Sequence, residues 1–316
     1  MAVWTFVGRR LAQLVPTLVV VSVLVFLLIH LIPGNPAYVI LGAQATPGQV
    51  AAVTKAMGLD RPLAVQYWIW LQHVLHGDLG QSYINGFPVA KLLALKFPAT
   101  LALAIGALVI ALGVGVPAGV AAAARPGSLL DRTVLTATSL GMGVPTFWLG
   151  ILLILAFSIS LHWLPPSGYV PFTQAPGQAL RDLVLPAVTL GVWEGALLAR
   201  FSRSATADAL GQLYVRTARA KGLSQRRILW GHAVRNALIP VLTVFGIQFG
   251  GLLGGAVITE AVFDWPGVGR LLVTSILERD YQVVQAVILV AVVVFLLVNL
   301  LTDLAYGLAD PRIRLR

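Results

Sequence analysis

The sequence contains no cysteine. A chain without thiols can form no disulfide, no iron–sulfur cluster and no thiolate zinc site, and it has no cysteine nucleophile. Charge is scarce as well, since Asp, Glu, Lys and Arg make up 11% of the 316 residues, against about 25% in soluble domains. This composition argues against a soluble globular enzyme, and its low charge also excludes an intrinsically disordered chain.

The motifs of nucleotide hydrolysis and metalloproteolysis are also missing. The sequence has no G-x-x-x-x-G-K-[ST] phosphate loop and no H-E-x-x-H zinc motif. His73 and His76, with Asp78 beyond them, could share a helix face, but two imidazoles alone make an incomplete metal site. We therefore expect no catalytic residue, no metal site and no cofactor on this chain.

Apolar residues are abundant, at 58% of the chain with a mean hydropathy of +0.87. Six stretches are long and apolar enough to cross a bilayer, and only one of them contains a charge, Glu194. The sequence thus predicts an all-α, polytopic membrane protein with six transmembrane helices. They cover residues 11–32, 98–124, 133–159, 183–199, 238–258 and 283–301.

The charges are distributed unevenly over the predicted loops. One set of loops and termini holds fifteen Lys and Arg against four acids, whereas the opposite set holds seven of each. Basic loops stay in the cytoplasm, so both termini are predicted to be cytoplasmic. The net charge of +10 is explained by this topology, and it requires no nucleic-acid partner.

Two predicted loops are long enough to have functions of their own. The outer segment 33–97 carries the aromatic cluster Tyr67, Trp68 and Trp70, which favours short helices near the membrane interface or a packed cap. The inner segment 200–237 is basic and rich in helix-forming residues, with predicted breaks at Gly222 and Gly231.

Polar side chains within the predicted spans are few. Glu194 could face a polar path, or it could pair with Arg200 or Arg203. Gln248 and Asn299 could line a translocation path or join neighbouring helices by hydrogen bonds. A proton-coupled secondary transporter that uses Glu194 is therefore an alternative of a different class.

Several motifs resemble those of one family. Residues 214–223 (YVRTARAKGL) and 235–240 (RNALIP) resemble the cytoplasmic loop of binding-protein-dependent ABC importer permeases, in particular the dipeptide and oligopeptide branch. Further matches follow the same order as in that branch: GDLGQS at 77–82, FDWPGVGRLL at 263–272, RDY at 279–281 and DPRIR at 310–314.

The resemblance implies a type I importer permease fold in the bacterial inner membrane and import of di- or oligopeptides. Nickel chelates or glutathione are alternative substrates within the same family. The implied partners are a second homologous permease, two ATP-binding subunits or domains that hold ATP and Mg, an extracytoplasmic solute-binding protein and membrane lipid. The implied division is an N-terminal segment 1–97, a permease core 98–309 and a cytoplasmic tail 310–316.

In that family a short coupling helix in the cytoplasmic loop rests in a groove of the ATPase. The resemblance assigns this contact to Thr217, Ala218, Arg219, Ala220, Lys221 and Gly222. Two departures stand out: the acidic residue of the family's Glu-Ala-Ala motif is absent, and Arg235 occupies the position of an expected proline.

Overall fold

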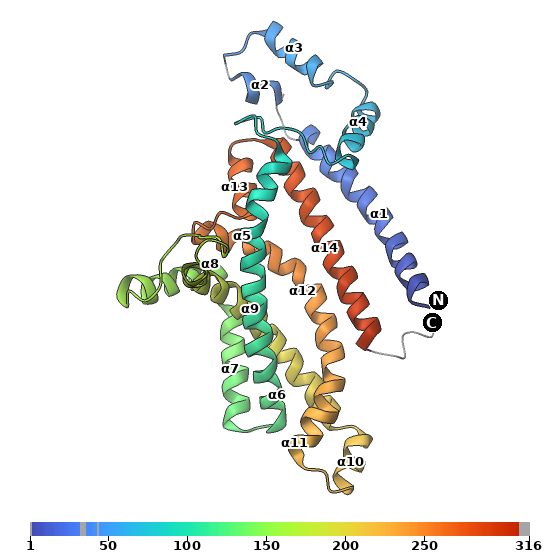
Figure 1. Ribbon diagram of the computed structural model, residues 1–316, viewed down its shortest axis with the longest axis vertical. Helices are drawn as coiled ribbons and strands as arrows, with labels where there is room; N and C mark the ends of the chain where they lie inside the picture. Colours follow the sequence, from blue (N-terminus) through green and yellow to red (C-terminus); the bar gives the residue numbers. More distant parts are fainter. Residues whose placement is uncertain (1, 32–35, 43, 310–316) are drawn as a thin grey trace. The chain divides into compact units, whose positions relative to one another are not determined.

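The computed structural model describes residues 2–31, 36–42 and 44–309, and these residues are helical apart from their connecting loops (Figure 1). They contain no β-strand, only an isolated bridge between Gln81 and Pro88. The all-α prediction is therefore confirmed for the described part. The predicted tail 310–316, with its DPRIR motif, lies outside the described residues.

The chain divides into two compact units, each built from segments far apart in the sequence. The first unit comprises Val3–Pro98 and Arg270–Leu297, and the second comprises Ala99–Gly269 with the chain from Val298 onward. Helices α5, α13 and α14 each contribute to both units.

The first unit contains the short helices expected in segment 33–97. Thr46 and Gln49 form a reciprocal capping box at the start of α3, with Pro47 in its first turn, so local sequence sets this boundary. The helices that contribute to this unit are α1 (Ala2–Leu31), α2 (Pro36–Leu41), α3 (Pro47–Ala56), α4 (Leu63–Leu75), α5 (Val89–Ile110), α13 (Val268–Leu277) and α14 (Tyr281–Ala309).

Helix α1 is the common contact of α4 and α14 within this unit. The rings of Tyr67 and Trp70 on α4 pack against Phe26, at centroid distances of 5.5 and 5.8 Å, and the Tyr67 hydroxyl lies 2.8 Å from Ser22 Oγ. The side chain of Gln285 on α14 donates to the backbone carbonyl of Val25 at 2.8 Å. Two of the three predicted cluster aromatics thus hold the unit together, whereas Trp68 is exposed.

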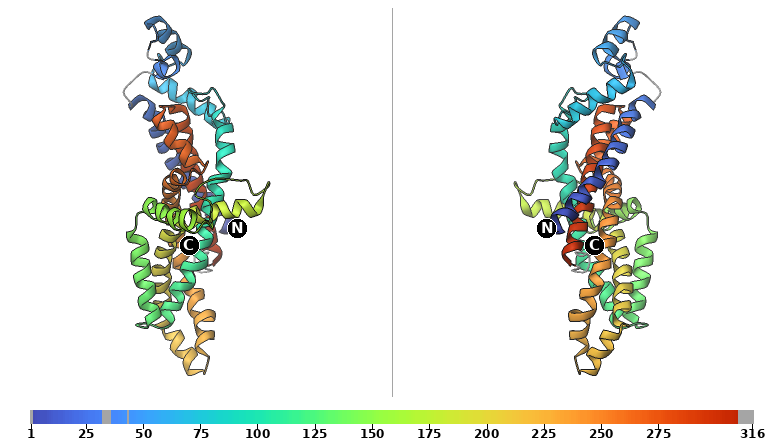
Figure 2. Two further views of the ribbon diagram at one scale, coloured as in Figure 1. Left: turned by 90° about the vertical axis from the view of Figure 1, so that its left-hand side faces the viewer. Right: turned by 90° about the vertical axis from the view of Figure 1, so that its right-hand side faces the viewer.

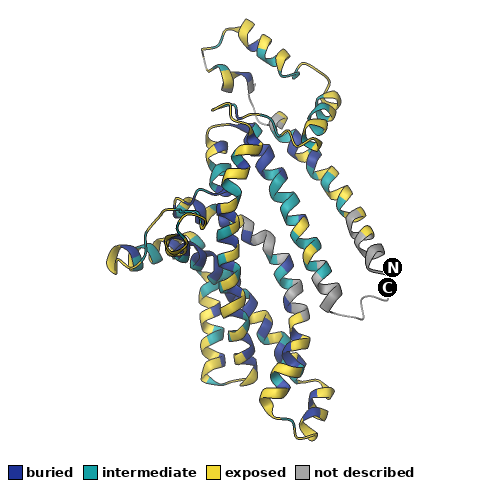
Figure 3. Ribbon diagram, in the orientation of Figure 1, coloured by how far each residue is buried: buried dark blue, intermediate teal, exposed yellow. Residues whose placement is uncertain are grey.

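The second unit is organised around one long, largely buried helix, α9 (Figure 3). Figure 2 shows the hairpin of α6 and α7 lying along α9, which also packs against α8 and α12. The elements besides α5 and α14 are η1 (Ala111–Gly115), α6 (Val116–Ala124), α7 (Leu129–Gly143), α8 (Thr146–Leu153), η2 (Ile154–Ser160), α9 (Pro176–Leu210), α10 (Leu213–Ala220), α11 (Gln225–Ile228), η3 (Leu229–Ala233) and α12 (Val234–Val262).

Glycines allow α9 to approach its neighbours at backbone distance. A Cβ on Gly115 would lie 2.4 Å from the carbonyl oxygen of Gly195, and one on Gly119 would lie 2.2 Å from that of Ala199. Such small-residue contacts are typical of helices that pack within membranes. At Gly255 on α12, a Cβ would likewise meet the side chain of Leu190 on α9 at 2.9 Å.

A buried polar cluster joins the start of the second unit to its FDWPGVG motif. Thr100 Oγ1 donates to Glu260 Oε1 at 2.6 Å and accepts from the Val268 amide at 2.8 Å. Trp265 Nε1 donates to the carbonyl of Ala99 at 2.8 Å. The motif after α12 is therefore fixed against the beginning of the second unit by side-chain hydrogen bonds.

Among the described residues, three helices are long and apolar enough to span a membrane: Val89–Ala124, Pro176–Leu210 and Tyr281–Thr302. A fourth candidate is the pair α7 and α8–η2, which bends by 104° at its break. The prediction of one continuous span over 133–159 is therefore wrong. Pro145 lacks an amide hydrogen and keeps Val144 extended, with a ψ of 124°, so the helix cannot continue through it.

Candidate functional site

The predicted coupling segment is a helix, a tight turn and a second short helix, α10 and α11. Gly222 ends α10 with a φ of +77°, a conformation that favours glycine. The Gly222 amide donates to the Arg219 carbonyl at 2.9 Å, and the Leu223 amide donates to that of Ala218 at 3.2 Å. This pair of bonds is a Schellman motif, so the predicted break at Gly222 is confirmed.

A small apolar cluster holds the α10–α11 turn in shape. Val215 and Ile228 are fully buried and Ala218 is nearly so, and Leu210 and Leu223 pack against them. The contact between Ala218 and Leu223 is the hydrophobic contact that commonly accompanies a Schellman motif. The turn is thus a packed unit rather than a loose linker.

This packing divides the six predicted coupling residues into two groups. Thr217, Arg219, Ala220, Lys221 and Gly222 are exposed, whereas Ala218 is 6% exposed and belongs to the cluster. Five of the six are therefore available to a partner. Ala218 contributes by holding α10 against Ile228.

The exposed surface beside the turn is basic. Ser224, Arg226, Arg227 and Trp230 line a shallow depression of about 520 Å³. At Gly231 the chain remains helical, as the π-helical segment η3, so the predicted break there is wrong. A π-helical turn absorbs an extra residue without ending the helix, and α11, η3 and α12 therefore follow one another directly.

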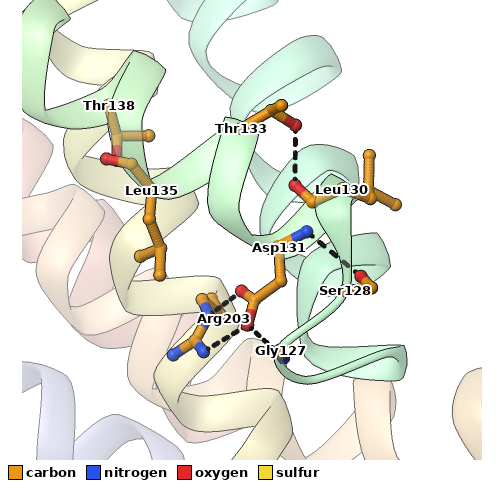
Figure 4. A network of polar contacts seen from close by, with 8 residues as sticks. All are labelled: Gly127, Ser128, Leu130, Asp131, Thr133, Leu135, Thr138 and Arg203. Atoms are coloured by element: carbon orange, nitrogen blue, oxygen red, sulfur yellow. Dashed lines mark hydrogen bonds and ion pairs between the residues drawn. The ribbon is translucent and has the colours of Figure 1, made fainter.

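Two polar contacts that were not predicted join segments of the second unit that are distant in the sequence. Asn236 Nδ2 on α12 donates to the Tyr214 hydroxyl on α10 at 3.1 Å, which joins the two motifs at 214–223 and 235–240. Asp131 accepts from both Nε and Nη2 of Arg203 on α9, the second at 2.8 Å, and from the Gly127 amide at 2.9 Å (Figure 4). Such pairs between distant segments leave no periodic signal in the sequence.

Glu194 pairs with neither of the arginines considered from the sequence. Arg203 binds Asp131, and Arg200 Nη1 points to the sulfur of Met142 at 3.9 Å. Glu194 is 4% exposed, and no described residue forms a hydrogen bond or ion pair with it. The proposed local ion pair is therefore wrong.

The position of Glu194 on α9 follows from its neighbours one turn away. Leu190 packs in the cluster that contains Leu252, and Leu198 packs with Val241, so this row of α9 faces α12. Gln248 is half-buried and lies between Val241 and Leu252 in the sequence of α12. Asn299 is half-buried on α14, and the described residues contain no hydrogen bond that joins these three polar side chains.

In the first unit, the GDLGQS and RDY motifs form one polar network. Asp280 is buried and accepts from the Ser82 hydroxyl and, at 3.1 Å, from the Tyr83 amide. Gln282 Nε2 donates to the Leu79 carbonyl at 2.8 Å, and its Oε1 accepts from the Tyr83 hydroxyl at 3.2 Å. Burial, together with the nearby charge of Asp280, raises the pKa of Tyr83 to about 12, so this phenol is neutral at physiological pH.

Histidines and acids do not gather into a metal site in the described part of the chain. No group of three His, Asp or Glu side chains there could hold a metal ion. His76 Nδ1 lies 2.7 Å from the carbonyl of Gln72, and Asp78 accepts from the Gly80 amide at 2.9 Å. These contacts belong to the local turn after α4.

Comparisons with known proteins agree with this architecture. Residues 115–315 match the family described as binding-protein-dependent transport system inner membrane component, and residues 3–104 match the N-terminal family of such membrane components. The chain is 44% identical to a protein named as a peptide transport system permease of Brucella abortus, over 97% of this chain and 98% of that one. It is also 44% identical to the glutathione transport system permease protein GsiC of Salmonella typhimurium, over 98% of each.

A solved structure supports the fold. A chain of the MetNI methionine ABC transporter, in inward-facing conformations, matches with a TM-score of 0.58 over 69% of this chain and 96% of that chain. Its sequence identity is 20%, so this likeness concerns the fold alone. From the family matches we conclude that the chain belongs to the inner membrane components of binding-protein-dependent transport systems and is a multi-pass protein of the bacterial inner membrane.

Proposed function

We propose that this chain is a permease subunit of an ATP-driven importer of short peptides, and that its α10–α11 turn receives force from a separate ATPase. The observation that carries the proposal is the turn itself. It is packed by Val215, Ala218 and Ile228, and it exposes Thr217 and the run from Arg219 to Gly222. A packed turn can transmit a push that a flexible loop would absorb. In this proposal the chain holds no ATPase site, and its partners bind ATP and Mg.

The proposed assembly follows from the family. A second, similar permease would complete the translocation path, two ATP-binding subunits or domains would contact the α10–α11 turn, and an extracytoplasmic solute-binding protein would deliver the substrate. We propose six transmembrane helices of a type I permease, with both termini in the cytoplasm and with α7 and α8–η2 as one bent span. Alternating access would then be a shift between two packed arrangements, biased by nucleotide.

Peptides are the proposed substrates because relatives of 44% identity are named for peptide and glutathione transport. Glutathione is itself a modified tripeptide, so both names indicate a path that accepts short peptide backbones. Nickel chelates are a further candidate from the wider family, and no observation on this chain favours them.

The coupling proposal is tested by placing a bulky cation on the exposed face of the turn. Ala220→Arg changes an exposed α10 position to another good helix former, so the turn should still fold. In proteoliposomes with the partner subunits, we expect peptide-stimulated ATP hydrolysis to fall about tenfold, the effect of losing about 1.4 kcal/mol of docking free energy. Ser204→Arg adds the same charge on exposed α9 and should hydrolyse ATP as the wild type does.

Unchanged stimulation by the Ala220→Arg protein would contradict the coupling assignment. An equal loss in both variants would mean that positive charge, rather than position, causes the effect. A loss for Ala220→Arg alone supports docking at the turn.

The proton-coupled alternative makes a different prediction for Glu194. If the carboxyl carries the driving proton, Glu194→Gln abolishes uptake even when ATP and all partners are present. In our proposal this variant retains ATP-dependent uptake within about threefold, because its amide fills the same volume between α9 and α12. Peptide uptake into vesicles, measured with and without ATP, separates the two classes.

A further inference from the structure

A cavity of about 720 Å³ lies within the first unit. This volume is within the range of roughly 300–1,000 Å³ that small-molecule sites occupy. Its walls come from α1, α2, the end of α3, α4 and the loop before it, the loop 80–86, and α14. The lining includes Phe26, Arg61, Trp70, Tyr83, Gln282 and Gln285.

One buried polar atom in this lining lacks a partner. Gln285 is 2% exposed, and its Nε2 donates to the carbonyls of Val25 and Phe26, at 2.8 and 3.3 Å. These bonds fix the orientation of the amide, and its Oε1 then accepts no hydrogen bond from any described residue. A buried acceptor without a donor is unfavourable, so a bound N–H group would stabilise this site.

Arg61 supplies the positive charge of the cavity. The described residues that line it include no Asp, Glu or Lys. Asp280 lies behind the lining, where its oxygens accept from Ser82 and Tyr83. Arg61 forms no ion pair with a described residue, and its guanidinium is therefore available to a carboxylate.

The backbone that carries Arg61 is held in place by Gln66. Gln66 Nε2 donates to the carbonyls of Leu59 and Arg61, at 3.1 and 2.7 Å, so its Oε1 is left as an acceptor for His30 Nε2 at 3.1 Å. Phe26 and Trp70, 5.8 Å apart, add an aromatic wall on which apolar side chains can pack. The site thus combines one cation, one unpaired acceptor and an apolar surface.

We infer that this cavity binds a short peptide, with the peptide's carboxylate at Arg61 and a peptide N–H donated to Gln285 Oε1. A free carboxylate, backbone N–H groups and apolar side chains together are what a short peptide offers. The inference rests on the proposed function, since it supplies a first holding site for the imported substrate on the permease itself.

The test uses the purified full transporter without its solute-binding protein and radiolabelled trialanine as the probe. We expect the wild type to bind trialanine and Arg61→Gln to bind it about tenfold more weakly. Lys55→Gln makes the same charge change at an exposed α3 residue outside the lining, and it should bind as the wild type does. Trialanine amide, which lacks the carboxylate, should bind equally to the wild type and to Arg61→Gln.

A second arm tests Gln285 with the probe Ala-sarcosine-Ala, whose central nitrogen carries no hydrogen. We expect the wild type to prefer trialanine severalfold and Gln285→Met, which keeps the length of the side chain, to lose that preference. If Gln285→Met fails to fold because its bonds to α1 are lost, the Arg61 arm still decides the inference.

Three results would overturn the inference that the cavity binds a peptide. The first is no trialanine binding by the wild type, and the second is that Arg61→Gln weakens the binding of trialanine and of its amide equally. The third is that Arg61→Gln lowers the affinity for the solute-binding protein and leaves peptide binding unchanged. The last would identify a segment of the binding protein as the occupant. ATP-dependent peptide uptake by the complete system separates this inference from the proposed function. Uptake without cavity binding refutes the cavity inference alone, whereas cavity binding without uptake refutes the proposed function.

Discussion

At the scale of single residues, Glu260 shows how a buried acid constrains its neighbours. It is fully buried, its carboxylate accepts from Thr100, and the backbone passes closely over it at Gly267. A Cβ on Gly267 would lie 2.1 Å from Glu260 Oε1, and one on Gly269 would lie 2.9 Å from Oε2. The FDWPGVG motif therefore needs glycine at these positions for space.

Gly267→Ala should consequently destabilise the second unit. The added methyl group would displace the Glu260 carboxylate from Thr100, at a cost of about 1–3 kcal/mol for overpacking and a lost buried hydrogen bond. Thermal unfolding in detergent measures this as a lower midpoint. Gly254→Ala is the matched control, because a Cβ there meets no atom within 4 Å. Equal unfolding midpoints for Gly267→Ala and Gly254→Ala would contradict this prediction. They would show that the residues around Glu260 accommodate the added methyl group without loss of stability.

Single residues were predictable where local conformation demands one residue type. Gly222 interrupts a run of helix-forming residues. In the structure its backbone adopts the left-handed conformation at the end of α10. The roles of Glu260, Asn236 and Asp131 could not be predicted, because each depends on a partner many residues away. Ala218 was assigned to a surface, whereas its packing against Ile228 depends on where α11 folds back.

At the scale of helices, the ion pair of Asp131 and Arg203 joins the start of α7 to α9. Asp131 is 3% exposed and also accepts a hydrogen bond from the Gly127 amide. This second bond helps to hold the carboxylate in position beside the guanidinium. The predicted loop charges put both residues on the same face of the membrane, and the contact agrees with that assignment. We expect this pair to set the register of α7 on α9.

A double-mutant cycle measures that contribution. Asp131→Asn and Arg203→Gln should each lower the unfolding free energy, and the double variant should lose less than the sum of the two single losses. Arg132→Gln removes a neighbouring exposed charge and should have little effect. Additive losses in the double variant would mean that the pair contributes nothing beyond its separate side chains.

Helices were predictable as helices, but their interruptions were not all visible. Val144 and Pro145 lie inside a long uncharged run, and hydropathy alone extends a single span across them. The structure differs because Pro145 interrupts the helical hydrogen bonds, and α7 and α8–η2 are bent by 104° at this break. The opposite error occurred at Gly231, where a π-helical turn preserves a helix that a glycine was expected to end.

At the scale of the whole molecule, the absence of cysteine makes topology directly measurable. A single introduced thiol is the only one present, so an impermeant maleimide reports which side of the membrane it occupies. We expect Asp60→Cys to be labelled on spheroplasts and Lys221→Cys to be labelled only after the membrane is permeabilised. Both positions are exposed, so accessibility depends on sidedness. Labelling of Lys221→Cys from outside would contradict the proposed coupling to a cytoplasmic ATPase.

The division into units was not predictable from the linear pattern. The expected boundary near residue 97 follows a change in composition, but Arg270–Leu297 returns to the N-terminal segment through contacts such as Asp280 with Ser82. Composition shows where an apolar segment replaces a polar one along the chain. It carries no information about which later segment packs against an earlier one.

The joining of two distant motifs by Asp280 and Gln282 has a consequence for protein engineering. A chimaera that takes only residues 3–98 from a related permease would set foreign loops against a native α14, and any mismatch at Gly80 would meet the side chain of Gln282. Transplanting this half of the molecule therefore requires both pieces, 3–98 and 270–297, from the same donor.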